Sequence, residues 1–229
     1  MHGAPCTLTM RKLIVAIDGP SGAGKGTIAR TLSIALGYRH IDTGAMYRAV
    51  AWEARREGIA LDDEGPVAEL ARRADITVEG GIVSINQHDV TRAIRTPDID
   101  RAAAAVARLP RVREALVARQ HSLGKTGGVV MEGRDIGTVV FPDADVKIYL
   151  DASAEERARR RAADPAHSGG QAGQAAVAEA IQARDQSDTM RTASPLTIAP
   201  DAVHIDTTGM PIDQVVETVL QLVRRHLSS

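Results

Sequence analysis

The chain has 229 residues, of which 44% are hydrophobic, and its 28 basic and 29 acidic residues leave a net charge of −1. This length suits one α/β core with additions, while the near-neutral charge and an aromatic content of 2% argue against a nucleic-acid coat, a membrane surface or a base-stacking platform for single strands. Cys6 is the only cysteine, which excludes an internal disulfide and a thiolate metal cluster and favours a reducing compartment, so we expect a cytoplasmic protein.

The N-terminal stretch, residues 1–10, is expected to be a flexible tail. Residues 1–9 lack the basic start and the apolar run of a signal peptide, and Met10 is the other candidate start. The longest apolar runs of the chain have about five residues, whereas a membrane span needs roughly 20. We therefore expect neither a membrane partner nor a nucleic-acid partner.

Short apolar runs alternate with helical patterns along the chain. This alternation predicts an α/β domain, a three-layer core around a five-stranded parallel sheet, in which ligand loops follow the carboxyl ends of the strands. Capping-box spacing of Ser153 and Glu156 and the positions of Pro66, Pro97, Pro110 and Pro211 mark expected helix starts. The expected strands are Leu13–Ile17, Tyr38–Ile41, Val129–Glu132, Val146–Leu150 and Val203–Asp206.

A glycine-rich loop follows the first expected strand and opens a helix. This order predicts a phosphate-binding loop, because glycines let successive N–H groups point at phosphate oxygens and the helix N-terminus adds positive charge. Lys25 supplies a full charge for the β- and γ-phosphates of a nucleotide. The residues expected to bind ATP are Gly19, Pro20, Ser21, Gly22, Ala23, Gly24, Lys25, Gly26 and Thr27.

The residue after the lysine narrows the class of loop. Most such loops place there a Ser or Thr whose hydroxyl binds Mg²⁺, whereas this chain has Gly26, and Thr27 follows one position later. We therefore expect Mg²⁺ to be held mainly by phosphates and water, with Thr27 nearby, rather than by a protein metal site. The Gly-Lys-Gly-Thr form resembles the loop of nucleoside monophosphate kinases.

Two regions interrupt the alternation. Residues 62–100 contain Ile76–Val78 and Ile82–Ile85 on either side of a Gly-Gly turn, which predicts a hairpin, and hence a small antiparallel sheet, in an inserted subdomain. An arginine-dense helix followed by the glycine-rich residues 164–174 predicts a short lid. The expected division is a tail 1–10, core 11–61, a monophosphate-binding insert 62–100, core 101–155, a lid 156–175 and core 176–229.

Arginine-bearing motifs mark the acceptor side. Arg134 follows a strand end, and Arg184, Asp188 and Arg191 fall on one helical face. Guanidinium groups suit phosphate, so the motifs together favour an anionic acceptor. The four motifs are Asp42–Arg48, Pro110–Glu114, Glu132–Asp135 and Arg184–Arg191.

The abundance of arginine also bears on the reaction. A kinase that phosphorylates an alcohol uses a carboxylate to take up the proton. A nucleoside monophosphate brings an oxygen that is already anionic near neutral pH, and it needs cations rather than a base. The arginines favour the second case, although Asp18, Asp42 or Asp135 could serve as a base.

The motifs together resemble the bacterial cytidylate kinase family from about Arg11 onward. The most specific stretch is Gly133–Pro142, Gly-Arg-Asp-Ile-Gly-Thr-Val-Val-Phe-Pro. The resemblance implies a P-loop kinase core with an enlarged monophosphate-binding insert and a short lid. It also implies transfer of the γ-phosphoryl group of ATP to CMP or dCMP with Mg²⁺, by a protein that we expect to be a monomer.

The resemblance also implies roles for single residues. Lys25 would bind the ATP phosphates, Arg191 would lie near the transferring phosphates, and Arg157 and Arg161 would be lid arginines that close on ATP. Arg134 and Arg184 would hold the monophosphate, which makes these six residues the expected catalytic set. The expected CMP-binding residues are Thr43, Tyr47, Arg48, Arg113, Arg134, Asp135, Arg184 and Asp188, of which Arg113 and Asp135 would read the cytosine edge and Arg184 and Asp188 would touch the sugar.

Three positions depart from the family pattern. Thr43 replaces a frequent Ser and keeps its hydroxyl, and Glu132 replaces Asp before Gly-Arg-Asp. Ala104 stands nearest to a Ser that contacts the base in some members, which bears on the tolerance for UMP. The alternatives are another small-molecule P-loop kinase acting on UMP, AMP or an alcohol, and a catalytically silent nucleotide-binding module.

Overall fold

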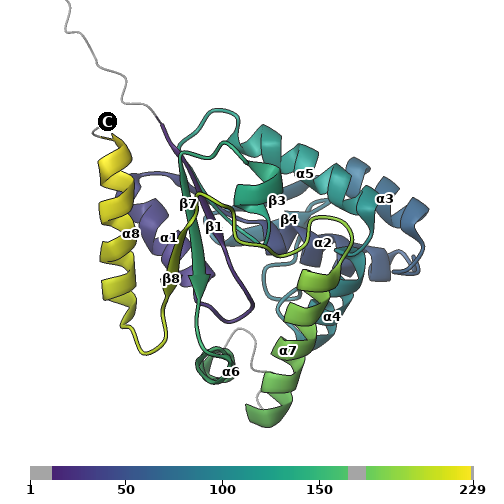
Figure 1. The fold of residues 1–229 in the computed structure, drawn as a ribbon. Helices are drawn as coiled ribbons and strands as arrows, with labels where there is room; N and C mark the ends of the chain where they lie inside the picture. Colours follow the sequence, from purple (N-terminus) through teal and green to yellow (C-terminus); the bar gives the residue numbers. More distant parts are fainter. Residues whose placement is uncertain (1–11, 165–173, 228–229) are drawn as a thin grey trace, which may run out of the picture.

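The computed structural model describes residues 12–164 and 174–227, and a parallel sheet lies at its centre (Figure 1). The strand order is β2-β6-β1-β7-β8, so the strand that precedes the phosphate loop is the central one. All five strands expected from the sequence are present, and the first two begin and end one residue later than expected. The bounds are β1 (Ile14–Asp18), β2 (Arg39–Asp42), β6 (Val129–Glu132), β7 (Val146–Asp151) and β8 (Val203–Asp206).

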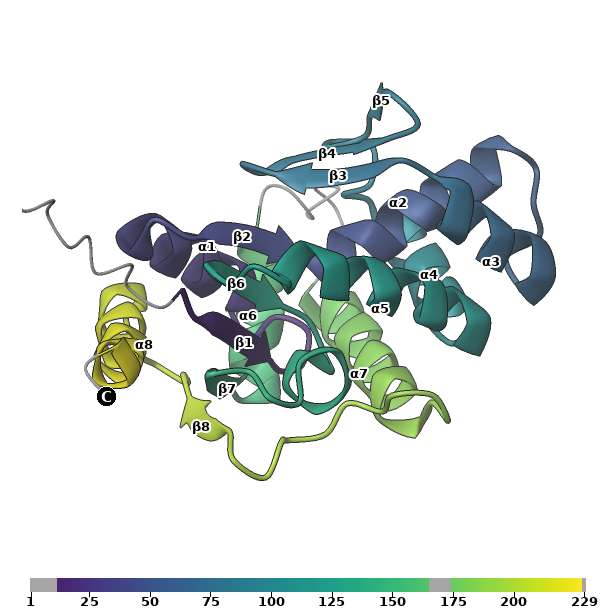
Figure 2. The ribbon, with the colours of Figure 1, turned by 90° about the horizontal axis from the view of Figure 1, so that it is seen from above.

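Helices cover both faces of this sheet, which confirms the layered α/β fold. On one face, α1 (Lys25–Leu36) and α8 (Ile212–Leu227) bury Leu32 and Val219 against the strands. On the other face, α5 (Pro110–Gly124) and the π-helical segment η1 (Ile136–Val140) pack on Ile41 and Met131. Figure 2 shows α1 and α8 together on one side of the sheet.

A second cluster of buried residues lies beside the sheet. Its members all come from residues 45–116, in α2 (Thr43–Arg56), α3 (Glu64–Arg73), α4 (Pro97–Val106), part of α5 and the small sheet. Figure 2 shows these elements grouped at one end of the molecule. The cluster reaches beyond the expected insert, 62–100, on both sides, and the division into domains stays a prediction.

The small sheet contains the expected hairpin and one further strand. β3 (Ile76–Glu79) pairs antiparallel with β4 (Ile82–Ile85) across Gly80 and Gly81, whose φ angles of 60° and 86° require the left-handed region. β5 (His88–Asp89) then pairs with β4. The sequence did not predict β5, because two exposed polar residues carry no strand pattern.

Local signals at the helix starts are mostly confirmed. Pro97 and Pro110 are first helical residues, and Ser153 Oγ accepts a hydrogen bond of 3.2 Å from Glu156 N at the start of α6 (Ala154–Ala163). Pro66, in contrast, is the third residue of α3, because the helix begins directly after Asp63. Pro211 immediately precedes α8.

Two further helices lie on the side of the sheet where the parallel strands end. α6 packs against α7 (Gln174–Met190), and both come from the C-terminal half of the chain. Most of the glycine-rich tip expected for the lid, residues 165–173, and the expected tail lie outside the described residues. None of the helices in the described part of the chain has the length and hydropathy of a membrane span.

Candidate active site

The loop between β1 and α1 has the backbone shape that a phosphate cradle needs. Gly19, Gly22 and Gly24 have φ angles of 147°, 80° and 91°. A Cβ at Gly22 would lie 2.8 Å from the carbonyl oxygen of Arg157, and one at Gly19 would run into the carbonyl oxygen of Leu150. The loop therefore depends on glycine both for its conformation and for its close packing against neighbouring backbone.

Lys25 lies folded back over this loop. Its Nζ donates a hydrogen bond of 2.7 Å to the carbonyl oxygen of Pro20, and the side chain is buried. Burial, and then the positive charge of Arg134, lowers the pKa of the Lys25 ammonium to about 7. Without a ligand, burial and Arg134 thus disfavour the charged form of Lys25, and an anionic ligand would favour it.

Asp188, in α7, forms ion pairs with three of the predicted arginines. Its carboxylate pairs with Arg134 Nε at 2.9 Å, Arg184 Nε at 3.3 Å and Arg191 Nη1 at 3.5 Å, while the residue is 2% exposed. Although burial opposes its ionisation, these arginines hold the pKa of Asp188 below its usual value. One buried carboxylate thus orders three cations, and each of them also donates to a backbone carbonyl oxygen, of Gly133, Asp100 or Ser194.

A second buried pair continues this network. Arg113 Nη2 donates to Asp135 Oδ2, and Arg191 Nη2 lies 3.7 Å from Asp135 Oδ1. The guanidinium of Arg113 lies 5.4 Å from the centroid of the Tyr47 ring, a distance suited to a cation–π contact. The structure thus brings together residues that the sequence separates by up to 144 positions, from Tyr47 to Arg191.

The start of α2 adds polar groups at the carboxyl end of β2. Asp42 accepts a hydrogen bond of 2.9 Å from Ala45 N and one of 2.8 Å from Arg48 Nη2. Thr43 Oγ1 donates 2.7 Å to the carbonyl oxygen of Glu132. Asp42 therefore caps the helix and fixes Arg48, while the hydroxyl of Thr43 keeps only its accepting capacity for a ligand.

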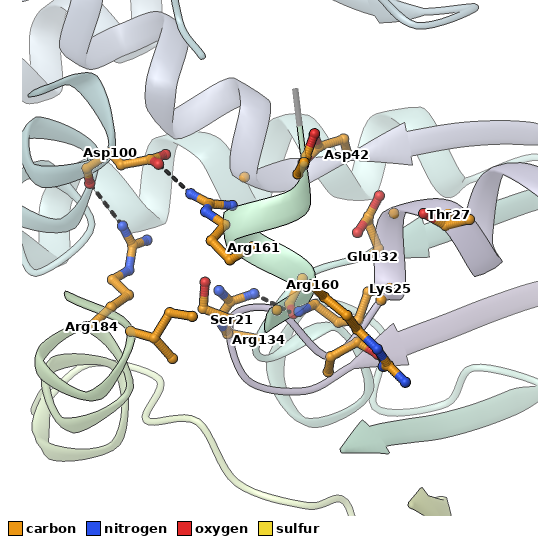
Figure 3. Close-up of a pocket in the computed structure, with 18 of the residues that line it drawn as sticks. Ser21, Lys25, Thr27, Asp42, Asp100, Glu132, Arg134, Arg160, Arg161 and Arg184 are labelled. Carbon is orange, nitrogen blue, oxygen red and sulfur yellow. Dashed lines mark hydrogen bonds and ion pairs between the residues drawn. The ribbon is translucent and has the colours of Figure 1, made fainter. Parts of the chain in front are cut away.

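The arginines of α6 contact both sides of the site. Arg157 donates 3.0 Å to the carbonyl oxygen of Ser21, and Arg160 donates 3.3 Å to that of Ala23, both within the phosphate loop. Arg161 instead pairs with the carboxylate of Asp100 in α4, whose carbonyl oxygen accepts 2.9 Å from Arg184 Nη1. Figure 3 shows Arg161 and Arg184 both directed at Asp100.

A pocket of about 1670 Å³ joins these groups. A single drug-sized ligand occupies a pocket of about 300–1,000 Å³, so this one has room for two nucleotides. Gly19, Pro20, Arg157 and Asp188 do not line it and support residues that do. The predicted site residues that line it are Ser21, Gly22, Ala23, Gly24, Lys25, Gly26, Thr27, Thr43, Tyr47, Arg48, Arg113, Arg134, Asp135, Arg161, Arg184 and Arg191.

Several site residues were not found by the sequence reasoning. Asp100 and Arg160 lie in ordinary helical patterns, and only the tertiary structure brings them to the pocket. Glu132 and Asp18 carried a weak signal, since each is the last residue of a buried strand, where ligand groups gather in α/β sheets.

Glu132 is the carboxylate beside the phosphate loop. A Cβ at Gly26 would lie 3.3 Å from Glu132 Oε1, and that oxygen pairs with His40 Nε2 at 2.8 Å. Although burial opposes its charge, the hydrogen bond to Glu132 and the charge of that carboxylate hold the pKa of His40 above its usual value. The absent side chain at Gly26 thus leaves space next to an acidic oxygen.

Asp18 is a second buried carboxylate beside the loop, at the end of β1. Burial raises the pKa of its carboxyl to about 6, against the opposing effect of hydrogen bonds from the backbone N–H groups of Gly137 and Ile136. Unlike Glu132, it is absent from the pocket lining. Its contact with the site therefore runs through the segment that it binds, at Ile136 and Gly137.

Mg²⁺ fits this arrangement as a phosphate-held ion. Among residues 12–164 and 174–227, no group of three or more histidine, cysteine, aspartate or glutamate side chains could hold a metal ion. Mg²⁺ usually keeps several waters and binds one or two carboxylates plus substrate phosphates. Glu132 and Thr27 both line the pocket, so a carboxylate and a hydroxyl are present there for an ion of this kind.

The sheet order, the glycine loop between β1 and α1 and the facing arginines define a P-loop kinase fold. A shikimate kinase from Acinetobacter baumannii, solved in complex with shikimate, has a similar structure with a TM-score of 0.50 and 15% identity, over 96% of this chain and 98% of that chain. This likeness concerns the fold alone.

The chain belongs to the cytidylate kinase family, whose family model matches residues 15–225. It is 47% identical to the cytidylate kinase of Solibacter usitatus (strain Ellin6076), over 96% of this chain and 95% of that protein. It is 46% identical to the cytidylate kinase of Bacillus subtilis (strain 168), over 94% of this chain and 98% of that protein. The resemblance drawn from the motifs and the predicted fold class are both confirmed.

Proposed function

We propose that the protein transfers the γ-phosphoryl group of ATP to CMP or dCMP, giving ADP and CDP or dCDP. As a member of the cytidylate kinase family it is a phosphotransferase. The observation that carries the proposal is that Lys25, the glycine loop and the three arginines on Asp188 line the same pocket. One side suits the phosphates of the donor, and the other suits the phosphate of the acceptor.

In this proposal the donor binds at the glycine loop. The N–H groups of the loop and the Lys25 ammonium hold the β- and γ-phosphates of ATP, and Arg157 and Arg160 keep α6 against the loop. Thr27 and Glu132 would hold Mg²⁺ beside the phosphate loop. When bound, the ion supplies neutralisation of the charge that develops during transfer.

The acceptor binds between α2, α4 and α7. Arg134 and Arg184 hold the CMP phosphate, with Arg191 beside them, while Arg113 and Asp135 face the base and Asp188 orders the sugar side. Thr43, Tyr47 and Arg48 complete this half, and Arg161 closes it from α6. Fixed cations of this kind hold two repelling phosphates in line, which is the main work of phosphoryl transfer.

The carboxylates that could act as a base for an alcohol are engaged in other contacts. Asp18 accepts from two backbone N–H groups, Asp42 pairs with Arg48, and Asp135 pairs with Arg113. A phosphate acceptor needs no base, because its oxygen is ionised above a pKa of about 6. These contacts therefore favour CMP or dCMP over an alcohol acceptor.

The test is a coupled ADP-release assay with Mg-ATP and equal concentrations of CMP, dCMP, UMP, AMP, GMP and shikimate. Fast turnover with CMP and dCMP alone would support the proposal. Fast turnover with UMP would mean that Ala104, which lines the pocket, fails to select the base. The absence of turnover with every acceptor, together with tight ATP binding, would favour a silent nucleotide-binding module.

The remaining parts of the proposal concern the cell. We propose a monomer in the cytoplasm, whose partners are its two nucleotide substrates. Sedimentation of the purified full chain would test the first point. A stable dimer at assay concentrations would contradict it.

A further inference from the structure

Asp18 joins two segments that bind different substrates. It is the last residue of β1 and directly precedes the glycine loop. Its Oδ1 accepts a hydrogen bond of 2.9 Å from Ile136 N, and its Oδ2 accepts one of 2.7 Å from Gly137 N. The side chain is 5% exposed, so these N–H groups take the place of water around the carboxylate.

The segment held by Asp18 carries the acceptor residues. Ile136 follows directly after Arg134 and Asp135, and Gly133 N donates a hydrogen bond of 3.0 Å to the carbonyl oxygen of Ile17. The turn is thus tied to the end of β1 on both sides of Arg134. Because only two dihedral angles per residue are soft, a turn fixed at both ends leaves Arg134 and Asp135 little freedom.

The packing around Gly137 shows how close this approach is. A Cβ at Gly137 would lie 3.2 Å from Lys147 Cδ and 3.5 Å from Asp18 Oδ2. The missing side chain lets the backbone reach the carboxylate. The side chain of Arg134 then leaves this turn to pair with Asp188, and that of Asp135 leaves it to pair with Arg113.

We propose that Asp18 is a positioning residue for phosphoryl transfer, which fixes the turn carrying Arg134 and Asp135 relative to the phosphate loop. The inference rests on the proposed function. The donor loop begins at the residue after Asp18, and the side chain of Asp18 binds the turn that carries the acceptor residues. One carboxylate therefore sets the distance between the donor and acceptor phosphates. A misplacement of about 1 Å at this separation can lower the rate about 100-fold.

The test is Asp18→Asn, which keeps the size of the side chain. An asparagine offers one oxygen acceptor and turns its NH₂ group toward the second backbone N–H, so one of the two bonds is lost. We expect kcat/KM for CMP to fall at least about tenfold, the loss of one hydrogen bond to a charged group. The dissociation constant of ATP should change less than about twofold, since the glycine loop keeps its own contacts.

The matched control is Asp145→Asn, because Asp145 bonds to Ile14 at the other end of β1. Asp145 Oδ2 accepts a hydrogen bond of 2.8 Å from Ile14 N, outside the pocket that holds the substrates. Both variants remove a carboxylate bonded to backbone beside β1, so both can lower stability. Only Asp18→Asn should change the kinetics with CMP, and an equal change in both would overturn the proposal.

A measurement on the unmutated protein keeps the proposal testable if Asp18→Asn does not fold. We expect the amide protons of Ile136 and Gly137 to exchange slowly, and at similar rates, with and without CMP. Rapid exchange that becomes slow only when CMP binds would show that the turn is not held beforehand, and would overturn the proposal.

The two proposals fail differently. If the unmutated protein does not phosphorylate CMP, the proposed function is wrong and this inference falls with it. If the unmutated protein is active and Asp18→Asn matches it in kcat/KM for CMP, only the role of Asp18 is wrong.

Discussion

Lys25 is the residue whose charge state depends most on the substrate. In the unliganded protein it is buried, bonded to the carbonyl oxygen of Pro20, and its pKa is about 7. The phosphates of ATP would bring negative charge next to it and raise that pKa toward the usual value of a lysine. At pH 8 the free protein holds Lys25 mostly neutral, and the complex would hold it charged.

We therefore expect ATP binding at pH 8 to take up close to one proton. The terminal phosphate of ATP adds little to this number, because a phosphomonoester is ionised above a pKa of about 6. Calorimetry in two buffers with different ionisation enthalpies measures the uptake. Lys25→Arg, which stays charged at every working pH, should bind ATP without it. An equal uptake in both proteins would assign the proton to another group.

Arg134 is the residue that we expect to separate donor binding from acceptor binding. Arg134→Ala should lower kcat/KM for CMP about 10–150-fold, since one hydrogen bond to a charged group contributes about 1.5–3 kcal/mol. Its Nε bonds only to Asp188, which keeps Arg184 and Arg191 as partners. ATP binding should therefore stay nearly unchanged in an equilibrium titration.

The control for Arg134→Ala is Arg72→Ala. Arg72 pairs with Glu69 at 3.0 Å on the exposed surface of α3 and lies outside the pocket. Exposed pairs of this kind contribute little, so its kinetics should match those of the unmutated protein. A loss of ATP binding in Arg134→Ala equal to its loss of CMP use would contradict the assignment of this arginine.

At the scale of single residues, the sequence predicted the features that lie within one short stretch of the chain. The glycine loop was recognised because its residues are contiguous, and Arg184 and Asp188 were placed on one face because helical spacing puts them there. The meeting of Arg134 with Asp188 spans 54 positions, and that of Arg161 with Asp100 spans 61. No short-range pattern encodes such pairs, so the sequence assigned Arg134 and Asp188 to one acceptor side without predicting that they contact each other.

Among the elements, α5 approaches the end of η1 closely at a glycine. Gly124 ends this helix, and a Cβ there would lie 2.7 Å from Phe141 Cε2. We expect Gly124→Ala to lower the free energy of unfolding by about 1–3 kcal/mol, because the Phe141 ring would have to leave its place against the sheet. Urea denaturation followed by circular dichroism measures the change.

A second helical glycine provides the comparison. Gly65, in the first turn of α3, has no neighbour closer than 3.9 Å to an added Cβ. Gly65→Ala should leave stability unchanged or raise it by up to about 1 kcal/mol, since alanine favours the helix. If both variants lost the same stability, the close approach to Phe141 would not be the cause.

Helices and strands could be predicted where the hydrophobic pattern agreed with the residues that mark the ends of an element. β1, β6 and β7 are mostly apolar, and Pro97 and Ser153 mark the starts of α4 and α6. β5 was missed because two residues cannot show a period, and the start of α3 was misplaced because Asp63, rather than Pro66, marks it. The contact of α6 with the phosphate loop depends on tertiary packing, which no local pattern contains.

In the whole molecule, two buried clusters frame one pocket. The cluster around α1 and α8 supports the phosphate loop, and the cluster of residues 45–116 supports Tyr47 and the start of α2. A ligand that spans the pocket would bind both halves at once. Linking two modules in this way can raise affinity about 10²–10⁴-fold when the linker matches the distance.

We therefore expect cytidine joined to adenosine through five phosphates to bind at least about 100-fold more tightly than ATP. The same two nucleosides joined through three phosphates are too close to occupy both halves and should bind about as ATP does. Isothermal titration would compare them. Equal affinity for the two linked compounds would mean that donor and acceptor do not bind end to end.

The chain leaves the parallel sheet after β2, forms the cluster of residues 45–116, and returns to the sheet at the neighbouring strand, β6. β2, which precedes the cluster, pairs with β6, which follows α5, and Asp42 lies opposite Glu132. The segment in between contributes every residue of its own buried cluster and none to the cluster around α1 and α8. Substitutions inside this buried cluster should therefore disturb the start of α2 and Tyr47 before they disturb the packing beneath the phosphate loop.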